Sequence, residues 1–430
     1  MSGGIYGGDE VSGLVFDAGS HSFRVGFAGE EYPKGDIPSY VGVQEIIPDG
    51  DVEMKEDAED TKNVNKKNFY IGTTKLIVPR PNTTIDSFMK DGMIENWEMF
   101  EQLLDYSYAN VLHTEAVYHP VLFTESAWNE KPKREQLTEL MFEKYNVPAF
   151  FLAKNAVLTV FANGRTGGLV VDSGATQTSA VPVYDGYAIT NAVVRSPIGG
   201  DVICEQVQHQ LDDYKIDLIP QYKVGSKEDV SENEVPKWQL KKNLPEVTEN
   251  YDAFMKKQVL EDIAATALQL SDTPIDLEYA EKLPSVRYTF PNGYNKDFMA
   301  DRVKVPEGLF DKNYLRTKNK EVLMNVTQIA SAAAGMCDID IRPILYSGLM
   351  VTGGNSLILG FTERLNHDLA HKCPPTIKLR VSAAPTPVER RFGAWIGGSI
   401  LGSLGSFQQM WIGKAEYEDT GKSIVEKKCP

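Results

Sequence analysis

The sequence contains little cysteine. Four cysteines occur in 430 residues, Cys204, Cys337, Cys373 and Cys429, and none lies within three residues of another. The C-x-x-C spacing of zinc and redox sites is therefore absent. Sparse, scattered cysteines are typical of a reducing compartment, where a free thiol acts mainly as a small buried hydrophobe.

Positive charge is also scarce. The chain has 44 Lys and Arg against 60 Asp and Glu, a formal net charge of −16. A phosphate backbone repels such a chain, which argues against direct, sequence-specific DNA binding. Apolar residues make up 42% and charged residues 24%, a balance that excludes global disorder. At roughly 100–200 residues per domain, the length predicts two or three domains or one large bilobal body.

Neither a signal peptide nor a membrane helix is expected. Residues 1–10 are Gly-rich and acidic, without a basic region followed by an apolar one. Residues 392–413 form a run of 22 residues without charge, which is long enough to span a bilayer. That run holds six Gly, three Ser and two adjacent Gln, whose polar groups would be costly in lipid. We expect a buried core helix and a Gly-rich turn there.

Three polar segments interrupt the patterned elements. Residues 48–68 and 223–244 predict surface loops or insertions, and residues 271–319, with four prolines, predict loops with short strands. Helical spacing of apolar residues occurs over 134–145, 201–211 and 363–370. Short apolar runs that end in Asp alternate with these helices, so the fold class is predicted to be α/β.

One motif occurs twice. Leu14-Val-Phe-Asp17-Ala-Gly-Ser is echoed, 155 residues later, by Leu169-Val-Val-Asp172-Ser-Gly-Ala. Each copy predicts a strand, a tight turn and a second strand. In such a tip, glycine permits a positive φ and successive N–H groups can bind an anion. Two facing tips could grip a triphosphate while both aspartates hold hydrated Mg²⁺. The alternative is that both are ordinary hairpin turns.

A third glycine motif follows the strand predicted at 349–352. Gly353 and Gly354 precede Asn355 and Ser356, either of which is expected to cap a helix that starts near Leu357. A helix N-terminus beside glycine favours an anion or a nucleotide. The G-x-G-x-x-G and G-K-[ST] patterns are absent, which disfavours Rossmann and P-loop folds.

These motifs resemble the actin superfamily. Residues 389–411, with Trp395-Ile-Gly-Gly-Ser, and the final Lys-Cys-Pro are similar to the actin C-terminus, and residues 16–30 are similar to its first phosphate loop. The resemblance covers 14–430. It implies an actin-like α/β fold, as in Hsp70 and hexokinase, with two related domains flanking a cleft for ATP and Mg²⁺. The implied domains are 1–165 with the insertion 48–68, 166–390 with insertions about 223–244 and 271–319, and 391–430 returning to the first.

Details resemble the nuclear branch of actin-related proteins. They are the opening at 1–10, His119-Pro-Val-Leu, residues 137–143 and residues 290–295. This resemblance implies a nuclear, chromatin-associated subunit of SWI/SNF-type remodelling and NuA-type histone acetyltransferase complexes, which act in transcription regulation and DNA repair. The implied partners are an actin monomer, a helicase-associated scaffold helix and, as a further candidate, histones.

The resemblance also implies a set of nucleotide-binding residues. They are Asp17, Gly19, Ser20, Arg24, Asp172, Ser173, Gly174, Gly199, Gly353, Gly354, Asn355 and Arg391, with Mg²⁺ held through water by Asp17 and Asp172. Arg24 stands where actin has a phosphate-contacting Lys.

The hydrolytic positions are altered. Asn155 replaces the Gln that places the attacking water, Ala175 an Asp, and Ser179 a His. Asn is one methylene shorter than Gln, and a misplacement of about 1 Å can cost about 100-fold. More loosely aligned, Glu261, Ala264 and Ala265 replace Arg, Lys and Glu. We expect structural ATP binding with slow or no hydrolysis, so no enzyme activity.

A partner groove is implied as well. Its positions are Phe161, Gly164, Thr166, Gly186, Tyr187, Leu401, Leu404, Ser406 and Met410. The spacing of Leu401, Leu404 and Met410 suggests one partly exposed helix face, although core positions would give the same pattern. The charged segment 48–68 disfavours filament formation, because docking it would desolvate charge. The alternatives are a filament-forming, ATP-hydrolysing actin and a sugar kinase or Hsp70-type ATPase.

Overall fold

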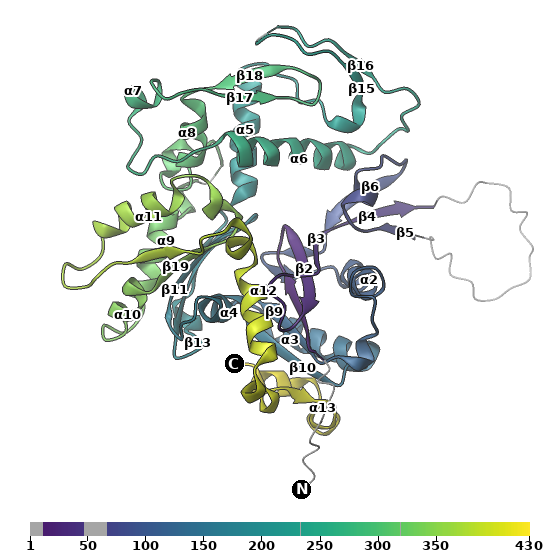
Figure 1. Ribbon diagram of the computed structural model, residues 1–430, viewed down its shortest axis with the longest axis vertical. Helices are drawn as coiled ribbons and strands as arrows, with labels where there is room; N and C mark the ends of the chain where they lie inside the picture. Colours follow the sequence, from purple (N-terminus) through teal and green to yellow (C-terminus); the bar gives the residue numbers. More distant parts are fainter. Residues whose placement is uncertain (1–11, 47–66, 233, 319) are drawn as a thin grey trace, which may run out of the picture.

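The computed structural model describes residues 12–46, 67–232, 234–318 and 320–430. Two large sheets organise the chain, and we call the parts built around them the first and second halves (Figure 1). The first sheet has the order β21-β10-β9-β1-β2-β3, made of β1 Leu14–Ala18, β2 Ser22–Phe27, β3 Gly35–Pro38, β9 Val121–Glu125, β10 Ala149–Lys154 and β21 Ile412–Gly413. The second has the order β13-β12-β11-β19-β20 with β14 on β12, made of β11 Gly168–Ser173, β12 Thr178–Tyr184, β13 Tyr187–Ala188, β14 Val194–Ser196, β19 Leu349–Thr352 and β20 Val381–Ala383.

The repeated motif forms two equivalent hairpins. Strand β1 pairs antiparallel with β2 and parallel with β9, and β11 pairs antiparallel with β12 and parallel with β19. Asp17 and Asp172 therefore sit at matching places, each near the carboxyl end of a central strand. The predicted hairpins and the actin-like α/β fold are confirmed.

Helices cover both sheets. They are α1 Thr73–Leu76, α2 Trp97–Ser107, α3 Lys131–Glu139, α4 Asn155–Ala162, α5 Gly200–Asp213, α6 Glu249–Ala267, α7 Leu277–Ala280, α8 Asp301–Glu307, α9 Val326–Gly335, α10 Arg342–Ser347, α11 Phe361–Ala370, α12 Pro387–Ser403, α13 Lys414–Thr420 and α14 Val425–Lys428. The three helices expected from periodicity correspond to α3 with the π-helical turn Leu140–Lys144, to α5 and to α11.

Two of the three polar segments can be described. Residues 223–244 contain the hairpin β15 Val224–Lys227 and β16 Trp238–Leu240. Residues 271–319 contain the expected short strands, β17 Val286–Thr289 and β18 Asn295–Phe298, but also α7 and α8, which the loop prediction missed. Helix α8 was hidden because Pro306 lies inside it. Residues 48–66 lie outside the described residues.

A small third sheet extends the first half. Its order is β5-β4-β6, made of β4 Tyr40–Glu45, β5 Lys67–Tyr70 and β6 Thr83–Ser87, and β6 is one of its edges. A two-stranded ribbon, β7 Met89–Lys90 and β8 Met93–Ile94, follows it.

The uncharged run forms the buried helix α12 and the turn after it. Thr386 and Glu389 make a capping box at the start of the helix, and Pro387 occupies its first turn. A Cβ added at Gly397 would lie 1.8 Å from the carbonyl oxygen of Leu158, so glycine is what lets α12 approach α4. Within the described ranges, no helix is long and apolar enough to cross a membrane.

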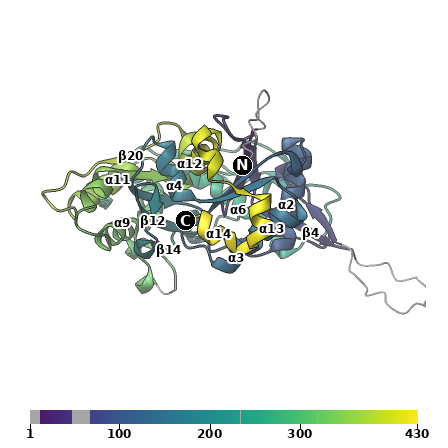
Figure 2. The same ribbon diagram turned by 90° about the horizontal axis from the view of Figure 1, so that it is seen from below.

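The end of the chain packs into the first half. Trp395, Phe407, Ile412 and Val425 belong to the same buried core as Phe16, and β21 pairs with β10. Figure 2 shows α14 beside α3 and α12 beside α4. The domain boundaries at 165 and 390 stay predictions.

Candidate functional site

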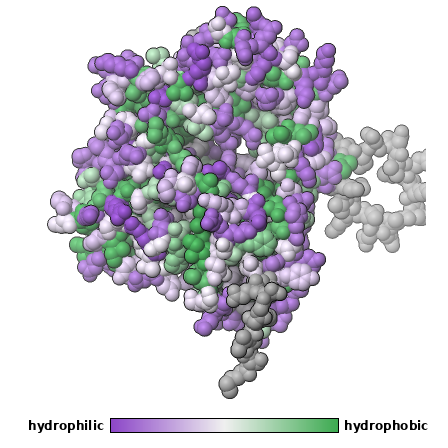
Figure 3. Space-filling model, viewed as in Figure 1, coloured by the Kyte–Doolittle hydropathy of each residue, from purple (hydrophilic) through white to green (hydrophobic). Residues whose placement is uncertain are grey.

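A cavity of about 710 Å³ lies between the two halves. That volume suits a nucleotide-sized ligand, and Figure 3 shows the surface hollowed near the middle of this face. Apart from the loosely aligned ones, thirteen predicted positions line it: Asp17, Gly19, Ser20, Arg24, Asn155, Asp172, Gly174, Ala175, Ser179, Gly353, Gly354, Asn355 and Arg391. The cavity thus brings together positions far apart in the sequence.

Two predicted contacts lie behind the cavity wall. Ser173 is fully buried, and its hydroxyl bonds that of Thr178 at 2.9 Å. A Cβ on Gly199 would lie 2.5 Å from the carbonyl oxygen of Ala175, so Gly199 packs against the second tip. Both residues support the wall, and neither lines the cavity.

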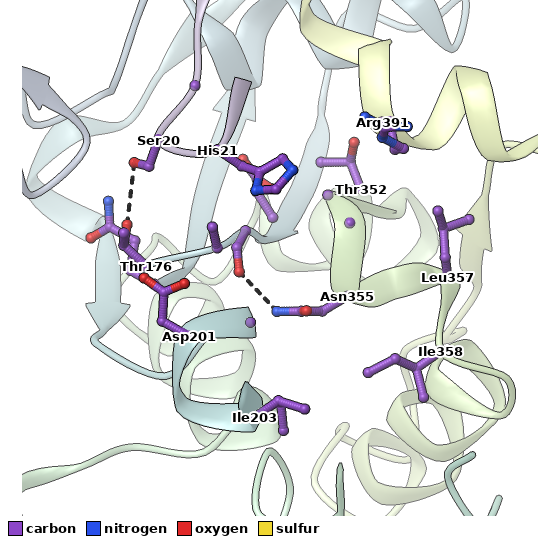
Figure 4. Close-up of a pocket in the computed structure, with 18 of the residues that line it drawn as sticks. Ser20, His21, Thr176, Asp201, Ile203, Thr352, Asn355, Leu357, Ile358 and Arg391 are labelled. Atoms are coloured by element: carbon purple, nitrogen blue, oxygen red, sulfur yellow. Dashed lines mark hydrogen bonds between the residues drawn. The ribbon is translucent and has the colours of Figure 1, made fainter. Parts of the chain in front are cut away.

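The two hairpin tips touch each other. The Thr176 hydroxyl donates to the Ser20 hydroxyl at 3.2 Å, and Figure 4 shows the two side chains facing each other, joined by this bond. One side chain comes from each half. The tips therefore meet through hydroxyls that can also bond to phosphate oxygens.

The predicted role of the tip glycines needs correction. The positive φ that glycine permits is not used at Gly19 or Gly174. Their amides are used inside the turns, from Gly19 to the Ser22 carbonyl (3.1 Å) and from Gly174 to the Gln177 carbonyl (3.0 Å). The first glycine is needed for space, because a Cβ on Gly19 would lie 2.9 Å from the backbone carbonyl oxygen of Ser22.

Asp17 is held by two donors. Arg24 Nη1 lies 3.0 Å from its Oδ2, and the Thr124 hydroxyl donates to its Oδ1 at 2.6 Å. Arg24 Nε also lies 3.6 Å from Asp36 Oδ1. Arg24 was expected to neutralise phosphate, but here its charge is shared with two carboxylates. With both Asp17 oxygens engaged, a metal would approach this carboxylate through water more readily than directly.

Asp172 has an unusual protonation equilibrium. Burial, together with the negative charge of Asp17, raises its pKa from 3.8 to about 6, while Arg24 acts in the opposite direction. Desolvation is the larger cause, because a charged carboxylate loses hydration in this site. A cation bound near Asp172 would favour the charged carboxylate and so lower its pKa.

The third loop differs from its prediction. Gly353 has φ 90°, and a Cβ there would lie 2.4 Å from Asp172 Oδ1, so only glycine fits. Asn355 was expected to cap a helix near Leu357. Instead its Nδ2 donates to the Gly174 carbonyl at 2.8 Å and to the Ser173 hydroxyl at 3.2 Å, and helix α11 begins only at Phe361.

The altered hydrolytic positions face the cavity. Asn155 begins α4, and its Oδ1 accepts from the amide of Ala156 at 2.8 Å. Ser179 lies opposite Asp172 in the β11–β12 register and is 4% exposed. Ala175 contributes no polar side chain at the second tip.

The side of the cavity away from the hairpin tips is lined by apolar residues and forms a slot. The sequence predicted only some of these residues. Ala264 and Ala265 of α6 line the cavity, as the loose alignment implied, with Ile203 of α5 and with Leu357 and Ile358. Figure 4 shows Ile203 and Ile358 pointing into the space below the tips, with Leu357 above Ile358. The apolar run that follows the Gly-Gly pair was the one available signal. Nothing in the sequence marked Gln269 and Arg302, which also line the cavity.

Comparison with known proteins settles the family. The sequence model of the family described as Actin matches residues 8–430. The chain belongs to the actin family. Actin-related protein 4 of Arabidopsis thaliana is 37% identical over 444 residues, covering 99% of this chain and all of that protein. Proteins of the same name from Emericella nidulans and Yarrowia lipolytica are each 34% identical, covering 99% of this chain and 98% and 97% of theirs. The chain is therefore an actin-related protein of this type.

The actin fold generally binds ATP with Mg²⁺, and the residues present fit that ligand. Gly354 has no atom within 4 Å of an ideal Cβ, which leaves open space beside the tips. Arg24 Nε is buried without a hydrogen-bond partner among the described residues. The described part holds no group of three or more His, Cys, Asp or Glu for a metal, so Asp17 and Asp172 suit an ion that keeps most of its water.

The positions predicted to form the partner groove come from the end of α4, from the turn before β13, and from α12 and the residues after it. A Cβ added at Gly186 would lie 3.5 Å from Phe161 Cζ, and the Gly186 amide donates to the Thr166 carbonyl at 2.7 Å. Tyr187 is 58% exposed, Leu404 45% and Met410 43%; Gly164 and Ser406 are exposed as well. One correction applies, because Leu401 lies in α12 while Leu404 and Met410 follow it, so the three do not share one helix face.

Proposed function

We propose that this protein is a non-catalytic, ATP-binding actin-related subunit of nuclear chromatin-remodelling and histone acetyltransferase complexes. The observation that carries nucleotide binding is the cavity itself, which gathers both hairpin tips, the Gly353 loop and an apolar slot into one site. Bound Mg²⁺ would offset phosphate charge near Asp17 and Asp172. Ser20, Thr176 and Arg24 would orient the phosphates, and Ile203, Leu357 and Ile358 would exclude water from the base.

We propose that hydrolysis is absent or very slow. Two observations support this. The side-chain oxygen of Asn155, on a shorter side chain than Gln, already accepts a hydrogen bond from the adjacent backbone amide, and Ala175 offers a methyl group in place of a carboxylate. Purified protein should yield ATP on acid extraction and chromatography and release little phosphate over hours. Phosphate release at an actin-like rate that Asp172→Ala abolishes would refute this part of the proposal.

We also propose that the groove beside α4 receives an amphipathic scaffold helix, with an actin monomer alongside. Exposed Tyr187, Leu404 and Met410 supply apolar surface of the kind such helices bury. Leu404→Asp with Met410→Asp should abolish co-purification with the scaffold subunit. The control is Leu240→Asp on β16, which is 61% exposed and distant in the fold. Equal retention of the scaffold by both variants would exclude this groove.

A further inference from the structure

Two histidines lie one helical turn apart at the end of α11. His367 belongs to the last turn of the helix, and His371 is its C-terminal cap. Residues four apart on a helix share one face, and the two rings are in contact, with centroids 5.0 Å apart and planes inclined by 73°. Figure 1 shows α11 on the outer side of the second half, away from the first half. Neither histidine lines the cavity.

Solvent reaches both rings. The side chain of His367 is 36% exposed, and His371 is exposed as well. Among the residues that the structure describes, no group is hydrogen-bonded to the ring of His371. Both nitrogens of that ring are therefore accessible. Because neutral imidazole is the commonest metal ligand in proteins, an accessible pair of such rings is a candidate metal site.

A carboxylate fixes the orientation of His367. The Nδ1 atom of this histidine lies 3.2 Å from Asp368 Oδ1. An ionised carboxylate can only accept hydrogen bonds, so Nδ1 carries the proton and Nε2 keeps its lone pair. Histidines that bind metals commonly donate their other ring N–H to a carboxylate in this way. His367 therefore has the tautomer that a metal ligand needs, with Nε2 as the ligating atom.

Asp368 is itself held in place by a buried arginine. Arg364 Nε donates to both oxygens of Asp368, at 3.1 and 3.2 Å, and the Thr327 hydroxyl donates to Oδ2 at 3.3 Å. The other two guanidinium nitrogens of Arg364 donate to Glu307, which is 1% exposed, at 2.7 and 2.8 Å. The orientation of His367 thus depends on buried contacts. Its ring would lose little further freedom on binding an ion, which favours binding.

The separation of the two rings suits a tetrahedral ion. With Zn–N distances of about 2.0–2.1 Å and about 1.2 Å from nitrogen to ring centre, two tetrahedrally bound imidazoles have centres about 5 Å apart. The observed separation agrees with this value. Imidazole suits Zn²⁺, Cu²⁺ and Ni²⁺, and the carbonyl end of a helix favours a cation. Within the described residues no third His, Cys, Asp or Glu joins the pair as a ligand.

We propose that His367 and His371 form a surface site for a transition-metal ion of the Zn²⁺ class. The ion binds Nε2 of His367 and one ring nitrogen of His371, and water completes its coordination. Because it joins the last turn of α11 to the residue that caps it, its binding stabilises this end of the helix. The site is separate from the cavity and does not depend on the proposed function.

Zinc titration of the full chain tests the pair directly. Zn²⁺ affinity is measured by competition with a chromophoric chelator, in excess Mg²⁺, which occupies oxygen-ligand sites. The affinity should fall at least about tenfold in His367→Ala and in His371→Ala. The two losses should not add in the double variant, because either change alone leaves a single imidazole. The control is His209→Ala on α5, where the ring lies 3.8 Å from Glu205 at the same spacing; it should keep the wild-type affinity.

Amide hydrogen exchange gives an independent readout. Zn²⁺ should slow exchange at residues 370–373 in the wild-type chain and in His209→Ala, but in neither variant of the pair. If the double variant binds Zn²⁺ as tightly as wild type, the two rings only pack edge to face, at a distance common for aromatic pairs, and the proposal is wrong. An equal loss of affinity in His209→Ala would also overturn it. Should His367→Ala disturb the helix, the exposed His371 still decides through His371→Ala alone.

Discussion

The raised pKa of Asp172 predicts that its charge destabilises the ligand-free protein. A shift of the folded pKa from 3.8 to about 6 corresponds to about 3 kcal/mol, at about 1.4 kcal/mol for each pH unit. The folded state binds the proton more tightly than the unfolded state. The free energy of unfolding therefore falls as pH rises from about 4 to about 6, and the full cost is present above that range.

Replacing Asp172 with Asn should remove this cost. In chelator, with nucleotide removed, Asp172→Asn should raise the free energy of unfolding by up to about 3 kcal/mol at pH 7.5 and by about half as much at pH 5. Chemical denaturation at the two pH values gives the difference between variant and wild type, which cancels the titration of other groups. The same variant should lose the stabilisation that Mg²⁺ and ATP give to the wild-type protein.

Asp213 supplies a control of opposite sign. Its hydrogen bond with Arg316 lowers its pKa, so Asp213→Asn should reduce stability at pH 7.5 slightly, because the pair is exposed. An Asp172→Asn variant that is less stable than wild type, or whose advantage is the same at both pH values, would refute the reasoning.

Three further predictions follow from the packing and the site. In Gly397→Ala, the added Cβ would lie 1.8 Å from the Leu158 carbonyl oxygen, so denaturant titration should show a loss of at least about 3 kcal/mol in the free energy of unfolding. The control is Gly405→Ala, which has open space around the added Cβ and should change the free energy of unfolding by no more than about 0.5 kcal/mol. Arg134→Ala should lower the free energy of unfolding by about 3–5 kcal/mol. The Glu125 carboxylate, which is 2% exposed, would then keep Lys154 at 3.4 Å as its remaining ion-pair partner in the described chain. Arg134→Lys should recover part of this loss. Asn155→Gln combined with Ala175→Asp should raise single-turnover phosphate release above wild type, and an unchanged rate would show that the hydrolytic defect lies elsewhere.

Local patterns predicted the elements that place the site. The two Asp-x-Gly hairpins and the Gly353 loop were visible because strand, turn and glycine are adjacent in sequence. The hydrogen-bond partners of those residues could not be predicted from the sequence. The Gly19 and Gly174 amides close their own turns, and Asn355 reaches back to the second tip rather than capping a helix. Such partners depend on the pairing of distant strands, which periodicity does not report.

The contact between the start of α6 and strand β6 could not be predicted from the sequence for the same reason. Asn250 and Ile85 are 165 residues apart, and each sits in an unremarkable polar or apolar pattern. Helix α8 was missed because a proline inside a helix contradicts the local rule, although Pro306 is buried there. Both the contact between α6 and β6 and the formation of helix α8 depend on tertiary contacts, which local sequence patterns do not encode.

The anchoring of residues 412–429 has a consequence for synthesis on the ribosome. Strand β21 pairs with β10, the Cys429 thiol accepts from the Leu152 amide at 3.3 Å, and Arg134 donates to the Cys429 carbonyl. Domains usually fold in order of emergence, N-terminal part first. Here the first half cannot complete its sheet until residues 412–413 have left the exit tunnel, whereas the strands of the second sheet, which end at residue 383, have all emerged earlier. We expect the later-synthesised half to mature first, with the nascent first half needing protection until then.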